Sequence, residues 1–593
     1  MKKRVADIIM DTLSALGVTE CFAVVGGGAM YLDNALDICK DIKVFFNHHE
    51  QACAMAAEAY ARYSGKMAAV CVTSGPGAVN ALTGVVGAWQ DSIPMIVLSG
   101  QVRYQTSVSA SGLPLRYRGM QEFEIVPAVR NMTKYARMIT DPLEIKRELV
   151  KAVHIAMDGR RGPVWLDIPQ DIQSAEVEEA DLYSAEKFDC SSVKPEQTVV
   201  NDILQTLQYA KRPCILAGSG IISSHVREEF SEFVNYMSVP VIGGAWVADV
   251  FYMEHPLYYG LSGNIGPRSG NFVLQNADVI LVLGNSLGFR QTGFNQSGFA
   301  PKAKIYMVDA DENEGKKPGL NIQQFLNASL QTFFDMAQIS DVKIQEHTEW
   351  IEYCDYLKQK FTVFESVQNL SQSEKVSSYC FWEKFQQYEE DDSILALGNN
   401  TASSAKLQIG TVKKGQRVMT NYTCGSMGYD LPAAIGAAVA SGKNVYCLTG
   451  DGSIMMNLQE LQTIVQYDLP IKLVVFNNNG YAAIRQTSNN FFSGRYIGCT
   501  PETGVSFPDF KKVADTFGFE YIKCETNGEV ETKLKQFFHS EQRIFLEVIQ
   551  KPDDPITPKV MSHLDENGKM QSPVLHDMFP FLDEEEMERL MLQ

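Results

Sequence analysis

Two polar clusters near residues 450 and 480 contain side chains that could bind a metal ion. Gly-Asp-Gly-Ser at 450–453 follows one apolar run, and Asn-Asn-Asn-Gly at 477–480 follows the next. Asp451 and Asn478 are 27 positions apart, the length of one helix and one strand. We therefore expect the clusters on adjacent loops at the carboxyl ends of parallel strands. Carboxylate, amide and backbone carbonyl oxygens suit Mg²⁺ or Ca²⁺.

The same clusters could hold an anion beside the metal. Gly450 and Gly452 allow the backbone to approach a ligand closely, and Ser453 is expected to open a helix whose N-terminus favours negative charge. Magnesium completes its octahedron with water and phosphate oxygens. Either cluster alone would more often be a tight turn. Their pairing at this spacing favours a metal-bridged diphosphate site.

The segments around these clusters alternate between apolar runs and amphipathic helices. An apolar run lies on each side of 453–466, whose spacing predicts one helix between two buried parallel strands. The same alternation recurs through most of the chain. We therefore predict an α/β fold of three consecutive doubly wound parallel-sheet domains, at 1–178, 190–340 and 376–552.

Shorter stretches connect and close these domains. In the first domain, apolar runs predict strands near 21–25, 67–74 and 94–100 and a closing strand within 162–172. Residues 175–197 are acidic and loop-like and predict a linker, whereas 344–361 predicts a helical connector. Residues 553–593 are rich in Asp, Glu, Met and Pro and predict a C-terminal tail or lid.

The composition is that of a soluble globular protein. Of the 593 residues, 45% are hydrophobic and 21% charged, and the formal net charge of −19 argues against nucleic acid as a partner. Twelve cysteines without a C-x-x-C pair indicate the reduced thiols of a cytoplasmic protein. No window reaches about 18 consecutive apolar residues, so no membrane span is expected. Residues 1–18 predict an amphipathic helix rather than a signal peptide.

With these motifs, the chain resembles thiamine diphosphate (ThDP)-dependent enzymes over nearly its whole length, and its segment order resembles the acetolactate (acetohydroxyacid) synthase branch. The resemblance implies a pyrimidine-binding first domain, a middle domain that binds FAD in some members, and a diphosphate-binding third domain. It also implies that Asp451, Asn478 and the backbone of Gly480 hold Mg²⁺. The other implied cofactor-binding positions are Pro76, Asn80, Asn399, Asn400, Gly425, Met427, Gly450, Gly452, Ser453 and Tyr481.

The resemblance also implies individual roles in the third domain. Asn399 and Asn400 match residues that touch the diphosphate. Met427 matches the residue that wedges between the two cofactor rings, and the backbone of Gly425 matches the acceptor for the 4′-amino group. Without the resemblance, a methionine next to an Ala-rich helix would be interpreted as core.

Glu50 matches the glutamate that faces the pyrimidine in this family, with Pro76 and Asn80 lining the same ring. The chemistry needs such a group, because a carboxylate bonded to N1′ drives the amino–imino shift that makes the 4′-imine a base. A solvated glutamate beside a helix is the ordinary alternative. Since family members build each site across a dimer interface, the resemblance implies a homodimer or homotetramer.

The fate of the acyl carbanion distinguishes the candidate reactions. Simple decarboxylases of this superfamily carry a histidine pair in a loop that here, at 105–126, contains no histidine. Gln121 and the residue after it resemble the Phe-Gln-Glu of synthases, although Met120 replaces the phenylalanine, and this favours a pyruvate-using carboligase with Gln121 in the site. Arg290 matches an arginine aimed at a substrate carboxylate, a surface ion pair being the alternative.

The acceptor and the flavin are less defined. Thr487 stands where acetolactate synthases have a tryptophan that shapes the acceptor pocket, so we expect a larger pocket. The end of the chain resembles synthase-like proteins of nucleotide-sugar pathways, so the acceptor hypothesis is a keto-sugar nucleotide. Whether the middle domain binds FAD stays open, because Asn285-Ser286 replaces the family's Ala-Arg. The competing functions are a non-ligating 2-oxo acid decarboxylase that releases an aldehyde, and a degenerate cofactor-binding scaffold.

Overall fold

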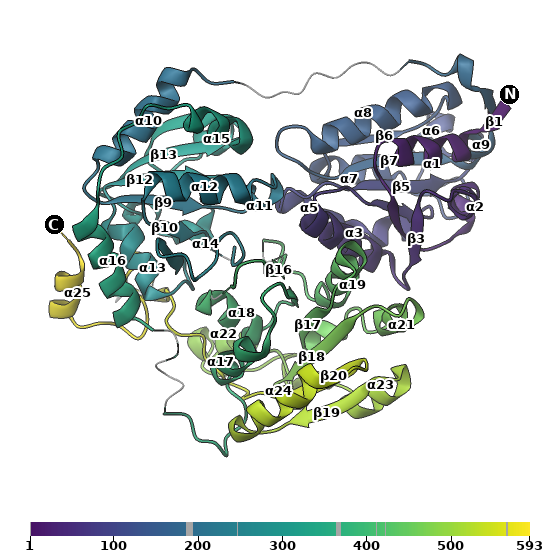
Figure 1. The fold of residues 1–593 in the computed structure, drawn as a ribbon. Helices are drawn as coiled ribbons and strands as arrows, with labels where there is room; N and C mark the ends of the chain where they lie inside the picture. The colour runs from purple at the N-terminus through teal and green to yellow at the C-terminus, as the bar shows by residue number, and fades with distance from the viewer. Residues whose placement is uncertain are drawn as a thin grey trace.

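The chain folds into three consecutive α/β units, each built on a six-stranded parallel sheet. The computed structural model describes residues 2–184, 194–245, 247–362, 364, 369–410, 412–421, 423–564, 567 and 569–592. The first unit (purple) and the middle unit (blue to teal) lie side by side above the third (green) in Figure 1. The predicted fold of three doubly wound parallel-sheet domains is confirmed.

The first sheet has helices on both faces. Its strands, in spatial order, are β3 (Lys43–Phe46), β2 (Glu20–Ala23), β4 (Ala69–Val72), β5 (Ile96–Gln101), β7 (Val164–Pro169) and β6 (Tyr135–Met138). One face packs on α1 (Val5–Ala15) and α8 (Ile145–Met157), the other on α3 (Glu50–Ser64) and α5 (Leu82–Gln90). The edge strands β3 and β6 were not predicted. Both lie at an edge of the sheet and contain a basic side chain, Lys43 in β3 and Arg137 in β6, so neither is apolar throughout like an interior strand.

The middle and third sheets repeat the parallel pattern. The middle strands, in spatial order, are β11 (Tyr258–Leu261), β10 (Val241–Gly243), β9 (Pro213–Ala217), β12 (Val279–Leu283), β13 (Lys304–Asp309) and β14 (Ile322–Asn327). The third sheet contains β16 (Arg417–Met419), β15 (Ile394–Leu397), β17 (Val445–Gly450), β18 (Ile471–Asn477), β20 (Ile544–Ile549) and β19 (Glu520–Cys524). Since β17 and β18 are neighbours, the loops that follow them meet at one edge of the sheet.

Two predicted helices differ from the structure. The single helix expected at 453–466 is divided into α20 (Asp451–Ile454) and α21 (Glu460–Gln466). Asn457, in the intervening turn, donates its side-chain amide to the Gly428 carbonyl at 2.7 Å and to Gln51 Oε1 of the first domain at 3.1 Å. The helix expected from residue 1 begins only at Val5, because residues 2–4 pair as a strand, β1, with β8 (Glu176–Glu178) in the predicted linker.

The remaining sequence expectations concern the linkers, thiols and membrane. Part of the linker prediction, residues 185–193, lies outside the described residues. The helical connector contains α16 (Thr348–Lys360). The cysteines in the described part of the chain are free thiols. Among the described helices, none has both the length and the apolar character to cross a membrane.

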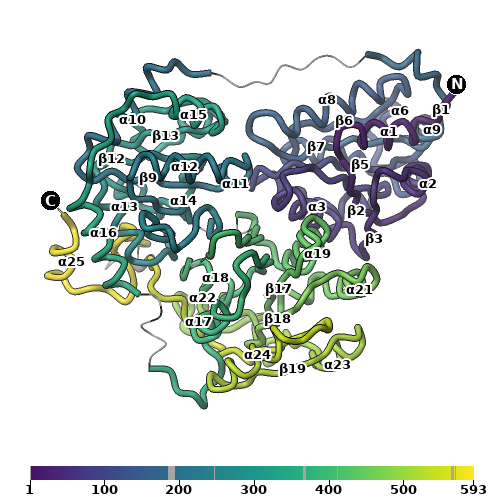
Figure 2. The backbone as a smooth tube through the Cα atoms, in the orientation of Figure 1, coloured from purple at the N-terminus to yellow at the C-terminus, as the bar shows by residue number. Residues whose placement is uncertain are grey.

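Helices α3 and α19 (Asp430–Ser441) join the first and third domains along a seam of small side chains. Both helices are rich in alanine, and a Cβ added at Gly436 would lie 2.0 Å from the carbonyl oxygen of Ala56. The two helices lie side by side in both backbone views (Figures 1 and 2). A larger side chain at Gly436 would separate the helices, so the seam depends on residue size.

The C-terminal tail packs on the middle domain. Asn271 and Asn276 of α13 (Arg268–Asn276) donate side-chain amides to the carbonyl oxygens of Leu575 and Leu590, at 3.0 and 2.9 Å. Leu575 and Leu590 are themselves buried. In Figure 1 the yellow end of the chain, with α25 (Glu584–Leu590), lies beside the middle domain. The C-terminal tail is therefore bound to the middle domain. That it also covers the site as a lid stays a prediction.

Asp167, at the end of the first sheet, should make stability depend on pH. Its two oxygens accept hydrogen bonds from Ser99 Oγ (2.6 Å) and Gln101 Nε2 (3.1 Å), but complete burial raises the pKa of Asp167 to about 7. The folded state therefore prefers the neutral acid. The stabilisation that the protonated Asp167 side chain gives is fully present below its pKa in the unfolded chain, about 3.9. This stabilisation is lost as the pH rises towards 7, the pKa in the folded state.

We expect the free energy of unfolding of Asp167→Asn to fall less between pH 4 and pH 8 than that of wild type. Urea unfolding should show the variant more stable than wild type at pH 8, by on the order of 2 kcal/mol, with a smaller difference at pH 4. Asp41→Asn, at an exposed aspartate, is the control and should follow the wild-type curve. Parallel pH curves for wild type and Asp167→Asn would contradict the assignment.

Candidate functional site

Asp451 and Asn478 meet at the edge where β17 and β18 end. The Oδ2 atom of Asp451 accepts hydrogen bonds from the backbone N–H groups of Asn478 and Gly480, both at 3.1 Å, and Oδ1 accepts from Gly452 at 2.8 Å. Asp451 is 2% exposed, and burial raises its pKa to about 6 although the surrounding N–H groups lower it. A buried carboxylate beside an amide and a backbone carbonyl is a fitting donor set for Mg²⁺.

Arg485 fixes the orientation of Asn478. Its Nη2 donates to the side-chain oxygen of Asn478 at 3.0 Å, to the backbone oxygen of Asn478 at 3.3 Å and to the carbonyl of Pro552 at 2.6 Å. Arg485 is 4% exposed. The sequence analysis missed it, because its partners lie in loops whose approach cannot be inferred from spacing.

Asn400 and Ser403 form a buried cradle next to this corner. Asn400 caps α18 (Thr401–Ile409), since its Oδ1 accepts from the Ser403 N–H at 2.9 Å. Asn400 Nδ2 and Ser403 Oγ are buried and have no hydrogen-bond partner in the structure. A Cβ at Gly450 would lie 3.1 Å from that of Asn400, so the cradle adjoins the Gly-Asp-Gly-Ser turn. Two unsatisfied donors at a helix N-terminus fit an anionic ligand such as a diphosphate.

Met427 and Tyr481 enclose the turn at Gly452. A Cβ at Gly452 would lie 2.2 Å from the ring of Tyr481 and 3.2 Å from the Cε atom of Met427. Only glycine fits there without displacing Tyr481. The two side chains, predicted separately, therefore share one wall of the site.

Ser453 is held by a carboxylate that the sequence analysis missed. Its hydroxyl donates to Asp430 Oδ2 at 2.6 Å and accepts from the Gly428 N–H at 2.9 Å. The Ser453 side chain therefore stabilises the turn that carries Met427, and the backbone of Ser453 is the part suited to an anion. Asn399 is exposed and donates to the carbonyl of Gly425 at 2.6 Å, which leaves the second lone pair of that carbonyl for a ligand.

The first-domain residues gather around Glu50. Glu50 is 9% exposed, and its carboxylate accepts from Asn80 Nδ2 at 3.0 Å. Asn80 ends α4 (Pro76–Asn80), and Pro76 begins this helix. The structure thus brings together the three residues predicted to face the pyrimidine.

The segment before Glu50 is attached to the third domain of the same chain. Glu460 Oε2 accepts from Asn47 Nδ2 at 2.9 Å, and Glu460 Oε1 accepts from the His48 N–H at 3.0 Å. Among the described residues, no hydrogen bond joins Glu50 to Asp451.

Gln121 lies against the turn that precedes Pro76. Its φ of 59° is unusual for a residue other than glycine, and its carbonyl oxygen would lie 2.3 Å from a Cβ at Gly75. Glu122 anchors this loop by accepting from the backbone N–H groups of Arg118 (2.9 Å) and Gly119 (2.8 Å). Glu122 is half-buried, and strained backbone held in place by such contacts is typical of functional loops.

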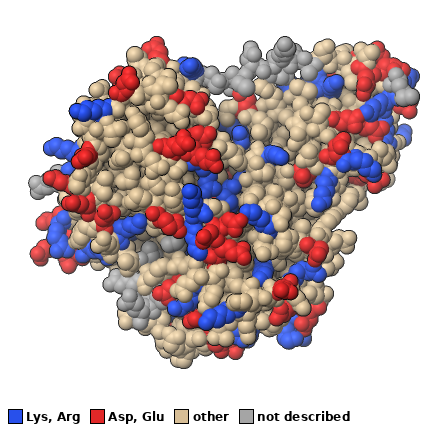
Figure 3. Space-filling model, viewed as in Figure 1, with Lys and Arg blue, Asp and Glu red and all other residues tan. Residues whose placement is uncertain are grey.

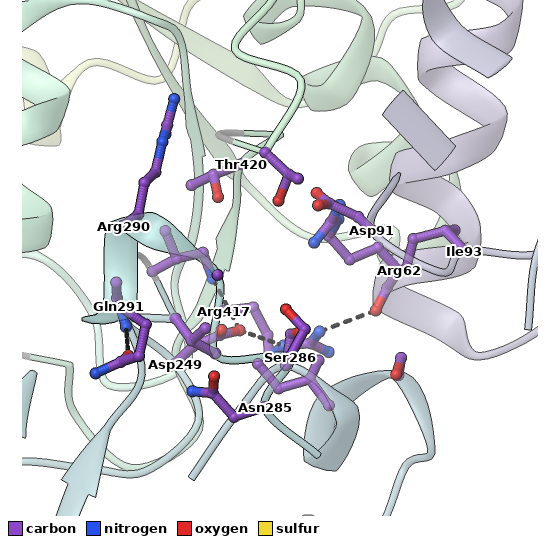
Figure 4. Close-up of a pocket in the computed structure, with 18 of the residues that line it drawn as sticks. Arg62, Asp91, Ile93, Asp249, Asn285, Ser286, Arg290, Gln291, Arg417 and Thr420 are labelled. Atoms are coloured by element: carbon purple, nitrogen blue, oxygen red, sulfur yellow. Dashed lines mark hydrogen bonds and ion pairs between the residues drawn. The ribbon is translucent and has the colours of Figure 1, made fainter. Parts of the chain in front are cut away.

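A cleft lies between the three domains, near the end of α3 that is opposite to Glu50. It contains a cavity of about 290 Å³, lined by residues that include Arg62, Asp91, Asp249, Arg290 and Arg417, and Lys and Arg side chains lie in the hollow between the two upper domains (Figure 3). Arg62 pairs with Asp91 at 2.6 Å, and Arg417 with Asp249 at 2.9 Å. Arg290 is directed away from the Arg417–Asp249 pair (Figure 4). Arg290 lines this cavity, and Glu50 is not among the residues that line it.

A second cavity, of about 140 Å³, adjoins the first and shares part of its lining. Ser219, Ser223 and Ser286 line both cavities, and Asp309 and Arg161 line the second. Burial raises the pKa of Asp309 to about 6. The two cavities adjoin each other and are lined by both polar and apolar side chains.

Comparison with known proteins shows matches along the whole chain. Residues 3–125 match the thiamine pyrophosphate enzyme N-terminal TPP binding domain, 200–332 the central domain and 396–548 the C-terminal TPP binding domain. A probable acetolactate synthase large subunit of Methanocaldococcus jannaschii is 32% identical over 582 residues, covering 93% of each chain. Isozyme 3 of the Escherichia coli acetolactate synthase large subunit is 29% identical, covering 90% of this chain and 91% of the relative.

Proposed function

Because the chain belongs to the thiamine pyrophosphate enzyme family and is an acetolactate synthase-like enzyme, we propose that it decarboxylates a 2-oxo acid, pyruvate in the first instance, and transfers the acyl carbanion to a carbonyl acceptor. The bond between the carbonyl carbon and the carboxylate breaks, CO₂ leaves, and the retained electron pair forms the new carbon–carbon bond. When bound, ThDP supplies the electron sink for that pair. The observation that carries the proposal is the buried, unsatisfied cradle of Asn400 and Ser403 beside Asp451.

The third domain is proposed to hold the diphosphate and metal. Asp451, Asn478 and the Gly480 carbonyl would bind Mg²⁺, and Arg485 would keep Asn478 oriented. The remaining proposed cofactor contacts in this domain are Asn399, Asn400, Gly425, Met427, Gly450, Gly452, Ser453 and Tyr481. The proposed domain division remains 1–178, 190–340 and 376–552 with a tail at 553–593, and the family matches within these ranges support it.

The first domain is proposed to act on the pyrimidine. Glu50 would hold the proton that moves at N1′, with Asn80 donating to its other oxygen and Pro76 shaping the wall. Gln121 would face the substrate from the strained loop.

We propose that the active protein is a homodimer or homotetramer. Exposed apolar side chains support this, since Tyr117 (75%) and Met120 (87%) in the first domain and Ile497 (80%) in the third are costly to leave in water. The free thiols support a reducing, cytoplasmic setting.

FAD is proposed as a ligand of these two adjoining cavities. Their serine and arginine lining and the Asp309 carboxyl suit a dinucleotide. A yellow protein that retains colour after dialysis is the expected result, and a colourless one would count against it.

The proposed acceptor is bulkier than a second 2-oxo acid, with a keto-sugar nucleotide as the leading hypothesis. Helix α22 (Ala482–Phe491) exposes Ile484 and Phe491 on the same face as Thr487, which supports a wide apolar wall there. Thr487 itself is small and bonds back to the Ala483 carbonyl at 3.0 Å.

An NMR time course of labelled pyruvate with ThDP and Mg²⁺ tests the reaction. We expect slow release of acetaldehyde without an acceptor and capture of the label when a keto-sugar nucleotide is added.

Thr487→Trp should reduce this capture about tenfold or more, because the indole would fill the pocket. Thr516→Trp is the control, because Thr516 is exposed on a helix and makes the same kind of backbone hydrogen bond. Rapid acetolactate formation from pyruvate alone would contradict the large-acceptor proposal, and acetaldehyde with no capture would favour a simple decarboxylase.

A further inference from the structure

The backbone on both sides of Glu50 is held by one short segment of the third domain. The backbone N–H of Phe46 donates to the Tyr467 hydroxyl at 2.7 Å, and the side-chain oxygen of Gln51 accepts from Asn457 Nδ2 at 3.1 Å. Asn457 precedes α21, and Tyr467 directly follows it. In Figure 1, α21 lies below β3, the strand that leads to Glu50. The neighbourhood of α21 therefore holds the chain both before and after Glu50.

Between these two contacts lies the carboxylate of Glu460, the first residue of α21. It accepts from the His48 N–H, from Asn47 Nδ2 and, at 2.7 Å, from the hydroxyl of Thr463. Glu460 is 0% exposed, and in the described part of the chain its hydrogen-bond donors are all neutral groups. A buried carboxylate without a cation costs free energy, so stability alone does not account for a glutamate here.

Asn47 is also kept in place at a cost. It is 6% exposed, and its Oδ1 atom is buried and has no hydrogen-bond partner among the described residues. Its amide is used only through the NH₂ group, which donates to Glu460. A buried polar side chain that is satisfied at one end indicates that the contact at that end requires it.

Glu460 and Glu50 also approach the same buried thiol. Burial raises the pKa of the Cys53 thiol, and the nearby carboxylates of Glu460 and Glu50 raise it further. Cys53 lies in α3, one turn after Glu50. Glu460 therefore lies close to the start of the helix that carries Glu50, in addition to holding the two residues before it.

We propose that Glu460 is a positioning residue. By holding Asn47 and His48, it fixes the carboxylate of Glu50 against the pyrimidine nitrogen with which Glu50 exchanges a proton. The inference rests on the proposed function, and it adds a residue that acts through the backbone before Glu50. A misplacement of about 1 Å is enough to cost on the order of 100-fold in rate, so this role accounts for a buried charge at this point.

Two variants at Glu460 test the proposal on the full-length protein. Glu460→Met keeps the length of the side chain but removes both acceptor oxygens, and it should lower kcat for pyruvate consumption about ten- to hundredfold. Glu460→Gln should recover most of the wild-type kcat, because glutamine keeps an acceptor for His48 and the Asn47 amide can rotate to accept from the new NH₂ group. The calorimetric affinity for ThDP should stay within about threefold of wild type in both variants.

Hydrogen exchange measures the contact without cofactor or turnover. In cofactor-free protein, the N–H groups of residues 46–51 should exchange faster in Glu460→Met than in wild type or Glu460→Gln, because the His48 N–H loses its acceptor. Glu148→Met is the matched control. Glu148 is buried in α8, on the opposite face of the first sheet, so this variant should lower thermal stability but leave kcat and the exchange at 46–51 unchanged.

Two further variants separate the route of the effect from folding. If Glu460 acts through Glu50, adding Glu460→Met to Glu50→Gln should lower kcat by less than about threefold more. Tyr467→Phe takes the place of Glu460→Met if that variant does not fold. It removes only the hydroxyl that accepts from the Phe46 N–H, so it should raise the exchange there and lower kcat about threefold.

Four outcomes would overturn the positioning role. The first is faster exchange in Glu460→Met with an unchanged kcat. The second is a parallel loss of kcat and ThDP affinity, which would assign Glu460 a structural role. The third is the full loss on top of Glu50→Gln. The fourth is an equal loss in Glu460→Gln and Glu460→Met, which would assign the effect to the charge. Wild-type protein that binds ThDP but consumes no pyruvate would instead contradict the proposed function and leave the contact measured by hydrogen exchange standing.

Discussion

Asp451→Asn is expected to reduce the affinity for Mg²⁺ and ThDP at least about 100-fold, above the range for residues that only support metal ligands. The carboxylate supplies the negative charge at the corner where β17 and β18 end, and asparagine would turn an NH₂ group towards the backbone donors of Asn478 and Gly480. Calorimetric titration of ThDP at fixed Mg²⁺ measures the effect. Asp468→Asn is the matched control, because Asp468 is 90% exposed on the loop before β18.

Ser403→Ala separates a binding defect from a folding defect. The Ser403 hydroxyl is buried and makes no hydrogen bond in the structure, so its removal should leave thermal stability without cofactor unchanged or higher. ThDP binding should still weaken about tenfold, because a hydrogen bond to a charged phosphate is lost. If Asp451→Asn and Ser403→Ala both bind ThDP within threefold of wild type, roughly the scatter expected of a single contact, the diphosphate assignment is wrong.

Glu50→Gln is expected to slow pyruvate consumption about 10²- to 10⁴-fold while ThDP still binds. Glutamine keeps the oxygen that accepts from Asn80 but cannot exchange a proton with the pyrimidine nitrogen. The comparison of kcat with ThDP affinity is the measurement. Glu176→Gln, at an exposed residue of β8, is the control.

A parallel loss of ThDP affinity and kcat in Glu50→Gln would assign Glu50 a structural role. An unchanged kcat in Glu50→Gln would show that Glu50 takes no part in the reaction. Either result leaves the metal site untested, because Glu50 and Asp451 belong to different domains.

Interior strands were predictable because they are apolar on both faces. β4 and β5 are fully buried and correspond to predicted runs, whereas the edge strands β3 and β6 were missed because each is short, partly exposed and contains a basic side chain. The division of the 453–466 helix could not be predicted, because the partners of Asn457 in the intervening turn, Gly428 and Gln51, lie outside that segment.

In the site, too, residues positioned by one βαβ unit were predictable, whereas residues positioned by packing between distant segments were not. Asp451 and Asn478 could be paired from the sequence, because one βαβ unit fixes their separation. Asp430 and Arg485 could not, since their partners are defined only by packing. Ser403 had a usable local signal: an asparagine three residues before it, at the start of a helix, is a typical N-cap.

The seam between α3 and α19 has a consequence for how the chain is made. Helix α3 ends at residue 64 and its partner begins at residue 430. At synthesis rates of roughly 5–20 residues per second, the intervening stretch takes about 20–70 s to leave the ribosome. Throughout that interval the alanine-lined face of α3 lacks its partner helix, so slower translation lengthens the period in which the nascent chain can aggregate.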